Sequence, residues 1–186
     1  AQSSEHPLFA HSFIVFFSAF ISAVQYCVVL PTCRSYVREM GGTAIVSGLI
    51  IGGADIVSIP CTLLLPLLTK KSFKLVFIIQ SVLGLLGNLL YATAGAPAVG
   101  SAAVAVAGRI VAGMVCSYSF TCPSFIANFV SERHRTAYMQ FLYMSVYFGV
   151  ALGPTIGAFL TGIGEYEVGG IFLVNMNTAP GWFMAG

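Results

Sequence analysis

Long apolar runs separated by short polar segments dominate the pattern of residues along this chain. The apolar positions do not alternate with polar ones, so the pattern excludes the strands of a membrane β-barrel and favours helices. A helix needs about 20 apolar residues to cross a bilayer, because the backbone groups must be paired within the segment. We therefore predict spanning helices over residues 12–31, 43–68, 73–94, 100–130 and 136–163, and the start of a sixth helix near residue 170.

Prolines indicate where these helices are interrupted. The fourth predicted helix is longer than a bilayer requires, so it must tilt, break near Pro123 or project from the membrane. Pro60 and Pro66 predict breaks in the second helix, and Pro154 predicts a kink in the fifth.

Composition narrows the class of protein. Of 186 residues, 58% are hydrophobic and only 8% are charged, whereas a soluble domain carries roughly 25% charged residues. These values exclude a water-soluble enzyme, and a net charge of +2 gives no sign of a nucleic-acid partner. We expect a multi-pass membrane protein whose surroundings are the lipid bilayer.

The distribution of basic residues predicts the orientation. Two predicted loops on the same side of the membrane hold most of them: Lys70, Lys71, Lys74, Arg133 and Arg135. The opposite side has Arg34 and Arg38, together with the acids Glu165 and Glu167. The positive-inside rule then places the N-terminus and the basic loops in the cytoplasm.

Arg109 is a cation within a predicted span. An arginine at the centre of a membrane helix costs at least ~2.5–3.5 kcal/mol unless it meets a polar cavity or partner. One interpretation is a site that binds an anionic solute or couples its movement. The alternatives are a side chain that reaches the interface or one that makes a structural bond to a neighbouring helix.

Asp55 is the acidic residue within a predicted span. Gly48, Gly52 and Asp55 share one helix face, so we expect close helix packing there and a carboxylate that points into a helix interface. It could serve proton coupling or gating, with Arg109 as a candidate partner. Alternatively, it is a packing residue whose carboxylate accepts bonds from nearby hydroxyls.

Neutral polar side chains complete the candidate pathway. Gln25, Tyr26 and Asn88 lie within apolar helices, where such groups line polar pathways or bridge helices at about 0.6 kcal/mol apiece. Structural bridging is the alternative for each of them.

The sequence holds no sign of a metal site, a cofactor or an enzyme. Its five cysteines form no CxxC pair, and we expect them to be small apolar packing residues. No phosphate-binding GxxxxGK[ST] loop occurs, and the histidines His6, His11 and His134 lie at or beyond the membrane edges.

Glycines on the fifth predicted helix carry a family resemblance. Gly149, Gly153 and Gly157 recur every four residues around Pro154, a spacing that permits backbone contact between helices. This run is similar to the GxxxGPxxGG pattern of the major facilitator superfamily, with Ala158 in place of the last glycine. Arg109 followed by Gly113 resembles the family's RxxxG motif. The loop with Lys70 and Lys71 lies where the family has its motif A, but lacks the glycines and aspartate of GxxxDxxGRR.

A narrower resemblance is to the transporter portion of SPX-bearing vacuolar phosphate transporters and their lysosomal relatives. It is carried by residues 28–32, 48–52, 87–92 and 177–185, and covers nearly the whole chain. No SPX domain is present in these residues.

The resemblance implies an all-α bundle that is the incomplete N-terminal half of a twelve-helix transporter, over residues 1–186, whose C-terminal half is missing. It implies alternating-access transport of a small solute, with an inorganic anion such as phosphate as a candidate, in a vacuolar or lysosomal membrane. Arg109, Asp55, Gln25, Tyr26 and Asn88 are the expected pathway residues. Gly149, Gly153, Pro154 and Gly157 are the expected hinge. A non-transporting scaffold and an inactive truncated half are the alternatives.

Overall fold

The computed structural model describes residues 5–96, 100–114, 118–162, 164, 166–168 and 172–185. Eight helices and one two-stranded hairpin are found in these ranges. They are α1 (Glu5–Cys27), α2 (Cys33–Glu39), α3 (Ala44–Thr69), α4 (Phe73–Thr93), α5 (Ala102–Gly113), α6 (Tyr118–Phe129), α7 (Glu132–Leu160), β1 (Tyr166–Val168), β2 (Phe172–Val174) and α8 (Ala179–Ala185). The all-α expectation is confirmed, with the short antiparallel hairpin as an addition.

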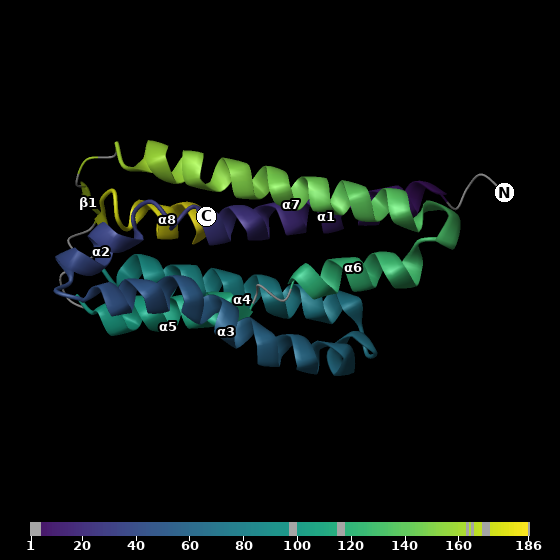
Figure 1. Cartoon of the computed structure of the whole chain (residues 1–186), viewed down its shortest axis with the longest axis horizontal. Helices are drawn as coiled ribbons and strands as arrows, with labels where there is room; N and C mark the ends of the chain where they lie inside the picture. The colour runs from purple at the N-terminus through teal and green to yellow at the C-terminus, as the bar shows by residue number, and fades with distance from the viewer. Residues whose placement is uncertain are drawn as a thin grey trace.

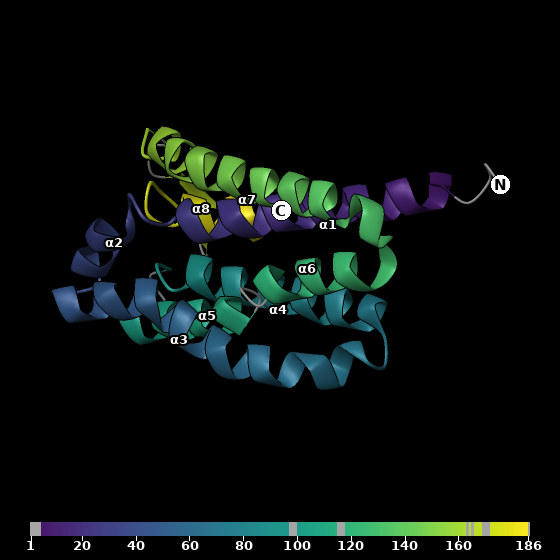
Figure 2. The same ribbon diagram turned by 45° about the vertical axis from the view of Figure 1, so that its right-hand side comes forward.

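The helices form two layers. Figures 1 and 2 show α1, α7 and α8 on one side and α3, α4, α5 and α6 on the other. The turns between α3 and α4 and between α6 and α7 lie at the same end of the bundle, as expected for the two basic loops. Helix α2 and the hairpin lie at the opposite end (Figure 1).

The chain is an integral multi-pass membrane protein. Among the described residues, four helical segments are long and apolar enough to cross a bilayer: Ala44–Thr69, Phe73–Thr93, Ala102–Phe129 and Glu132–Leu160. The third of these runs over residues 115–117, which are not described. The predicted first span corresponds to α1, whose apolar part, His11–Cys27, is shorter than the other four.

Helix α1 ends earlier than expected. It stops at Cys27 instead of residue 31, and the Leu30 amide bonds the Cys27 carbonyl in a tight turn. Pro31 explains the ending, because a proline disfavours helical geometry in the residue before it. The polar residues that follow form the short helix α2, which the hydrophobic pattern did not predict.

The predicted proline breaks are wrong for α3 and α6. Helix α3 continues through Pro60 and Pro66, as proline is tolerated in membrane helices when neighbouring groups satisfy the freed carbonyls. Pro123 lies inside α6, where it removes a single bond near the helix start. Helix α7 also begins one turn before the predicted residue 136, with Glu132 in its first turn, where a negative charge suits the helix dipole.

The predicted sixth helix is wrong between residues 172 and 178. Residues Phe172–Val174 form β2, and α8 begins only at Ala179. Between them the Asn175 side chain accepts bonds from the backbone amides of Asn177 and Thr178, at 3.0 and 2.9 Å. This local turn holds the chain away from helical geometry before α8 starts.

The turn before α8 is fastened to α2. Asn177 is fully buried, and its amide donates to the Glu39 carboxylate while accepting a bond of 2.6 Å from the Ser35 hydroxyl. These bonds join positions 138 and 142 residues apart in the sequence. They fix the end of the bundle that carries α2.

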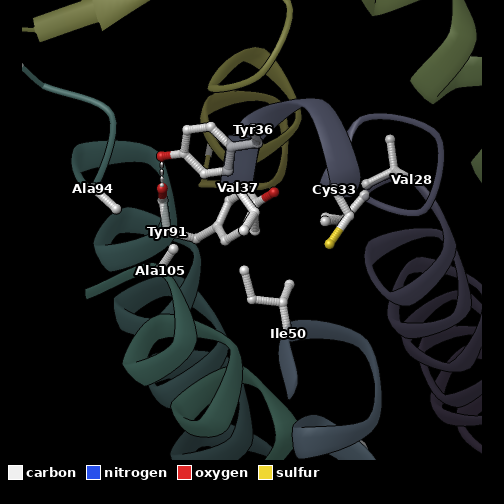
Figure 3. Close-up of a cluster of buried hydrophobic side chains, with 9 residues drawn as sticks. Val28, Cys33, Tyr36, Val37, Ile50, Tyr91, Ala94 and Ala105 are labelled. Atoms are coloured by element: carbon white, nitrogen blue, oxygen red, sulfur yellow. Dashed lines mark hydrogen bonds between the residues drawn. The ribbon is translucent and has the colours of Figure 1, made fainter. Parts of the chain in front are cut away.

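A buried core lies directly beneath α2. Figure 3 shows Tyr36 and Val37 of α2 packed among Ile50, Tyr91 and Ala105. The Tyr36 hydroxyl donates to the Tyr91 carbonyl at 2.8 Å, and burial raises the pKa of the Tyr36 phenol well above its usual range. Helix α2 therefore caps the ends of α3, α4 and α5.

Candidate functional site

A polar face of α1 lies between the two layers. Ser18, Ser22, Gln25 and Tyr26 fall at helical spacing, and each of them lines at least one cavity. Three hollows meet along this face. We name them the Asp55 cavity, the Arg109 recess and the Gln80 cavity.

The Asp55 cavity has a volume of about 230 Å³ and lies among α1, α3, α6 and α7. Its polar lining is Ser22, Tyr26, Asp55, Tyr118, Ser119, Cys122 and Tyr143. The Gln80 cavity has a volume of about 210 Å³ and lies among α1, α4, α6 and α8. Ser18, Ser22, Gln25, Gln80, Ser81 and Tyr118 supply its polar groups.

The Arg109 recess lies beside both cavities and holds only about 10 Å³, roughly the space that one water molecule needs. Ser22, Gln25, Tyr26, Asn88 and Arg109 line it, together with Ala54 and Ala112. The fold thus brings four of the five expected pathway residues to one recess. The fifth, Asp55, lies in the adjoining cavity.

Close helix packing delivers Arg109 to this recess. A Cβ atom on Gly108 would lie 2.8 Å from the Gly87 carbonyl oxygen, and one on Gly113 would lie 2.5 Å from the Ala54 Cα. Glycine at these positions lets α5 approach the backbones of α4 and α3. Arg109, next to Gly108, is therefore held between helices.

Arg109 is 4% exposed, so its side chain does not extend to the membrane surface. Its Nε donates to the Ile50 carbonyl on α3 at 3.5 Å, and its Cζ lies 5.9 Å from the centre of the Tyr26 ring on α1. The alternative in which the Arg109 side chain reaches the membrane interface is therefore wrong. Arg109 does make a structural bond to a neighbouring helix, as the other alternative expected, and it lines the recess as well.

Asp55 differs from its expected placement. It is exposed to the Asp55 cavity, and among the described residues no ion pair joins it to Arg109. Its Oδ2 instead accepts a bond of 2.8 Å from the Tyr26 hydroxyl. A Cβ atom on Gly48 or Gly52 would meet no atom within 4 Å, so the expected close packing on this face is wrong.

Asn88 of α4 and Gln25 of α1 both line the recess. Asn88 is 1% exposed and donates through Nδ2 to the Met184 carbonyl at 3.5 Å, which ties α4 to α8. Its Oδ1 has no hydrogen-bond partner among the described residues and lies in a recess that Arg109 also lines. Gln25 lines both the recess and the Gln80 cavity.

Sequence reasoning missed Ser18 and Ser22 among the lining residues, whereas Gln80 and Tyr118 were recognised as polar side chains within predicted spans. Ser18 and Ser22 lie four residues apart on α1, a small-polar spacing that could have indicated a polar helix face. Tyr118 lines both cavities, and its hydroxyl lies 3.2 Å from the Ser81 hydroxyl. Gln80 donates to Thr121 at 3.0 Å, a pairing that no sequence signal indicates.

The glycine stripe of α7 faces α1. Gly149, Gly153 and Gly157 are buried, and a Cβ atom on each would collide with α1 or with the turn that follows it: near Phe20, near Cys27 and near Val28. Pro154 is half-buried beside them. The expected close packing is present, while the hinge role stays a prediction.

The basic loop residues lie apart from the recess, at the end of the bundle with the α3–α4 and α6–α7 turns (Figure 1). Lys70, Lys71, Lys74 and Arg133 are exposed, and Arg135 is half-buried. Within the described ranges, no three His, Cys, Asp or Glu side chains gather as metal ligands. Cys27, Cys33, Cys61 and Cys122 are free thiols, and Cys116 lies outside the described residues.

Comparison with known proteins gives distant relatives along most of the chain. An SPX domain-containing membrane protein of Oryza sativa subsp. indica is 27% identical over 167 residues, which are 90% of this chain and 23% of that protein. One from Oryza sativa subsp. japonica is 27% identical over 159 residues, 85% of this chain and 22% of its own length. One from Arabidopsis thaliana is 25% identical over 168 residues, with shares of 90% and 23%.

The chain is a helical membrane protein distantly related to these SPX domain-containing membrane proteins. It spans about a quarter of the length of the relatives it matches. No family model matches it.

Proposed function

We propose that this chain is part of an alternating-access secondary transporter that carries a small inorganic anion such as phosphate. It would contribute the incomplete N-terminal bundle of a major facilitator fold and would act together with a C-terminal half. The observation that carries the proposal is the gathering of Arg109, Tyr26, Gln25 and Asn88 around one recess within membrane-spanning helices.

The cost of burying a charge in a membrane favours a functional role for this cluster. A buried guanidinium in a membrane is costly, and the Ile50 carbonyl alone leaves most of its donors for other acceptors. A planar cation with several fixed donors matches an oxyanion such as phosphate. The neutral amides of Gln25 and Asn88 provide additional polar groups without adding a competing charge.

The remaining parts have matching roles in this proposal. The Asp55 carboxylate in the adjoining cavity is a candidate for proton coupling. The glycine stripe of α7, with Pro154, serves as the joint at which α1 and α7 move together or slide. The positive-inside rule applied to the basic loops supports a cytoplasmic N-terminus, and the family resemblance supports a vacuolar or lysosomal membrane.

Uptake of labelled inorganic phosphate by proteoliposomes that contain the full-length protein tests the proposal. We expect Arg109→Ala to lower uptake more than tenfold, because a lost hydrogen bond to a charged group costs about 1.5–3 kcal/mol. Arg109→Lys keeps the charge but not the planar donor set, so it should restore part of the uptake.

Arg34→Ala is the matched control, since Arg34 is an exposed cation on α2 away from the recess. Each variant is checked for membrane insertion and for a single sharp peak in size-exclusion chromatography. Uptake by Arg109→Ala close to that of the wild type would remove the proposed role of this cation. A well-inserted wild-type protein that carries no inorganic anion would favour the scaffold alternative.

A further inference from the structure

Tyr26 lies in the wall between the Asp55 cavity and the Arg109 recess. It lines both hollows, whereas Asp55 lines only the cavity and Arg109 lines only the recess. Tyr26 and Ser22 therefore form the wall that an anion in the larger cavity meets on the side of the recess. In the arrangement seen here, with the Tyr26 ring in place, the recess has a volume of about 10 Å³, so an oxyanion can enter it only after the ring has moved.

Tyr26 contacts a charged group on each side of this wall. Its hydroxyl donates to Asp55 Oδ2 at 2.8 Å, and its ring lies 5.9 Å from Arg109 Cζ. A hydrogen bond to an ionised carboxylate is roughly twice as strong as one to a neutral acceptor. The contact between a cation and a ring adds a weaker attraction on the other side.

We propose that Tyr26 is a proton-controlled gate between the Asp55 cavity and Arg109. While Asp55 is ionised, its bond to the hydroxyl keeps the ring against the guanidinium. Protonation of Asp55 removes the charge that strengthens the bond, so the ring can turn away and the anion can reach Arg109. This inference rests on the proposed anion transport and adds the order of events: the proton arrives before the anion binds.

The other polar side chains that line the Asp55 cavity are ordinarily neutral. Tyr26 faces it from α1, Tyr118 and Cys122 face the same cavity from α6, and Tyr143 does so from α7. Phenols and thiols are ordinarily neutral near pH 7. Arg109 carries a positive charge and contacts the Tyr26 ring. The Asp55 carboxylate is thus the one negative charge among the described residues that line the cavity and the recess.

Exchange of labelled phosphate at equal concentrations across proteoliposomes tests the gate, because exchange needs no driving gradient. In the wild type, exchange should be slow at neutral pH and faster at acidic pH. Tyr26→Phe keeps the ring but loses the bond to Asp55. We expect its exchange at neutral pH to rise about tenfold toward the acidic value, which corresponds to the loss of one charge-assisted bond.

Tyr147→Phe is the matched control, because Tyr147 is a 71% exposed tyrosine of α7 that lines neither cavity nor recess. Asp55→Ala completes a double-mutant cycle, and Asp55 is exposed, so its truncation leaves no buried hole. If Tyr26 acts through Asp55, Tyr26→Phe should change exchange by less than about twofold in the Asp55→Ala background.

The outcomes separate the gate from the transport function. A wild-type protein that exchanges phosphate, with a Tyr26→Phe variant that keeps the same pH profile, overturns the gate alone. Additive effects in the cycle also overturn it. A wild-type protein that exchanges phosphate at no pH refutes the proposed function and the gate with it. If Tyr26→Phe does not insert, Asp55→Ala decides, because unchanged exchange at neutral pH overturns the gate.

Discussion

Substituting alanine for Gly153 should loosen the bundle between α1 and α7. The added Cβ atom would lie 2.5 Å from the Cys27 Cβ and 3.2 Å from the Val24 carbonyl oxygen. Carbon atoms in normal contact are about 3.5–4.0 Å apart, so the helices must separate by about 1 Å. The Cys27 Cβ is fixed to its backbone and cannot rotate away, so the strain passes to the whole helix pair.

The magnitude follows from two opposing effects. Forcing an extra methyl group into a packed interface costs about 1–3 kcal/mol. Replacing glycine by alanine inside a helix gains up to about 1 kcal/mol from backbone propensity. We expect a net loss of about 1–2 kcal/mol for Gly153→Ala. Gly52→Ala should be neutral or slightly stabilising, since a Cβ atom there meets nothing within 4 Å.

Unfolding of the two variants in mixed detergent micelles, followed by circular dichroism, measures this difference. The comparison cancels the shared propensity effect and leaves the packing cost. If Gly153→Ala is as stable as Gly52→Ala, the close contact between α1 and α7 does not exist in the folded protein, and the reasoning from the glycine stripe fails.

Two further variants test the end of the bundle that carries α2. Asn177→Ala should lower the free energy of unfolding by about 2–3 kcal/mol, because it removes a bond to the Glu39 carboxylate and one from the half-buried Ser35 hydroxyl. Asn128→Ala, at an exposed position with a local bond, is its control, and equal losses would contradict the fastening of α8 to α2. Tyr36→Phe should lower the free energy of unfolding by about 1 kcal/mol, because the bond to the Tyr91 carbonyl is lost. Tyr147→Phe is the exposed control, and an unchanged melting midpoint of Tyr36→Phe would contradict that bond.

The hydrophobic pattern predicted much of the architecture because the bilayer imposes simple demands on sequence. Helices α3 and α4 lie within one residue of their predicted bounds, since the apolar run must be about as long as the membrane is thick. The basic loops occupy one end of the bundle for a related reason: charges stay outside the hydrocarbon. The distant relatives agree with the narrower resemblance, and they cover about the same share of the chain.

The pattern was wrong where local turns compete with helix formation. The Asn175 side chain bonds the two backbone amides that a sixth helix would have used, so apolar residues before it form a strand. The two prolines of α3 were expected to break it, and a break near Pro123 was one alternative for the fourth span, but α3 and α6 continue through these residues. Such outcomes depend on neighbours that hydropathy does not describe.

The sequence by itself determined that this is a helical membrane protein with a buried arginine, because the cost of polar groups in lipid leaves few alternatives. Only the tertiary structure decided how the polar residues meet. Asp55 was expected to point into a helix interface, with Arg109 as a candidate partner, yet it lines a cavity and accepts a bond from the Tyr26 hydroxyl of α1. Helical spacing fixes which residues share a face of one helix. Which faces meet depends on close backbone contacts such as Gly108 against Gly87, and these form only when the whole bundle has packed.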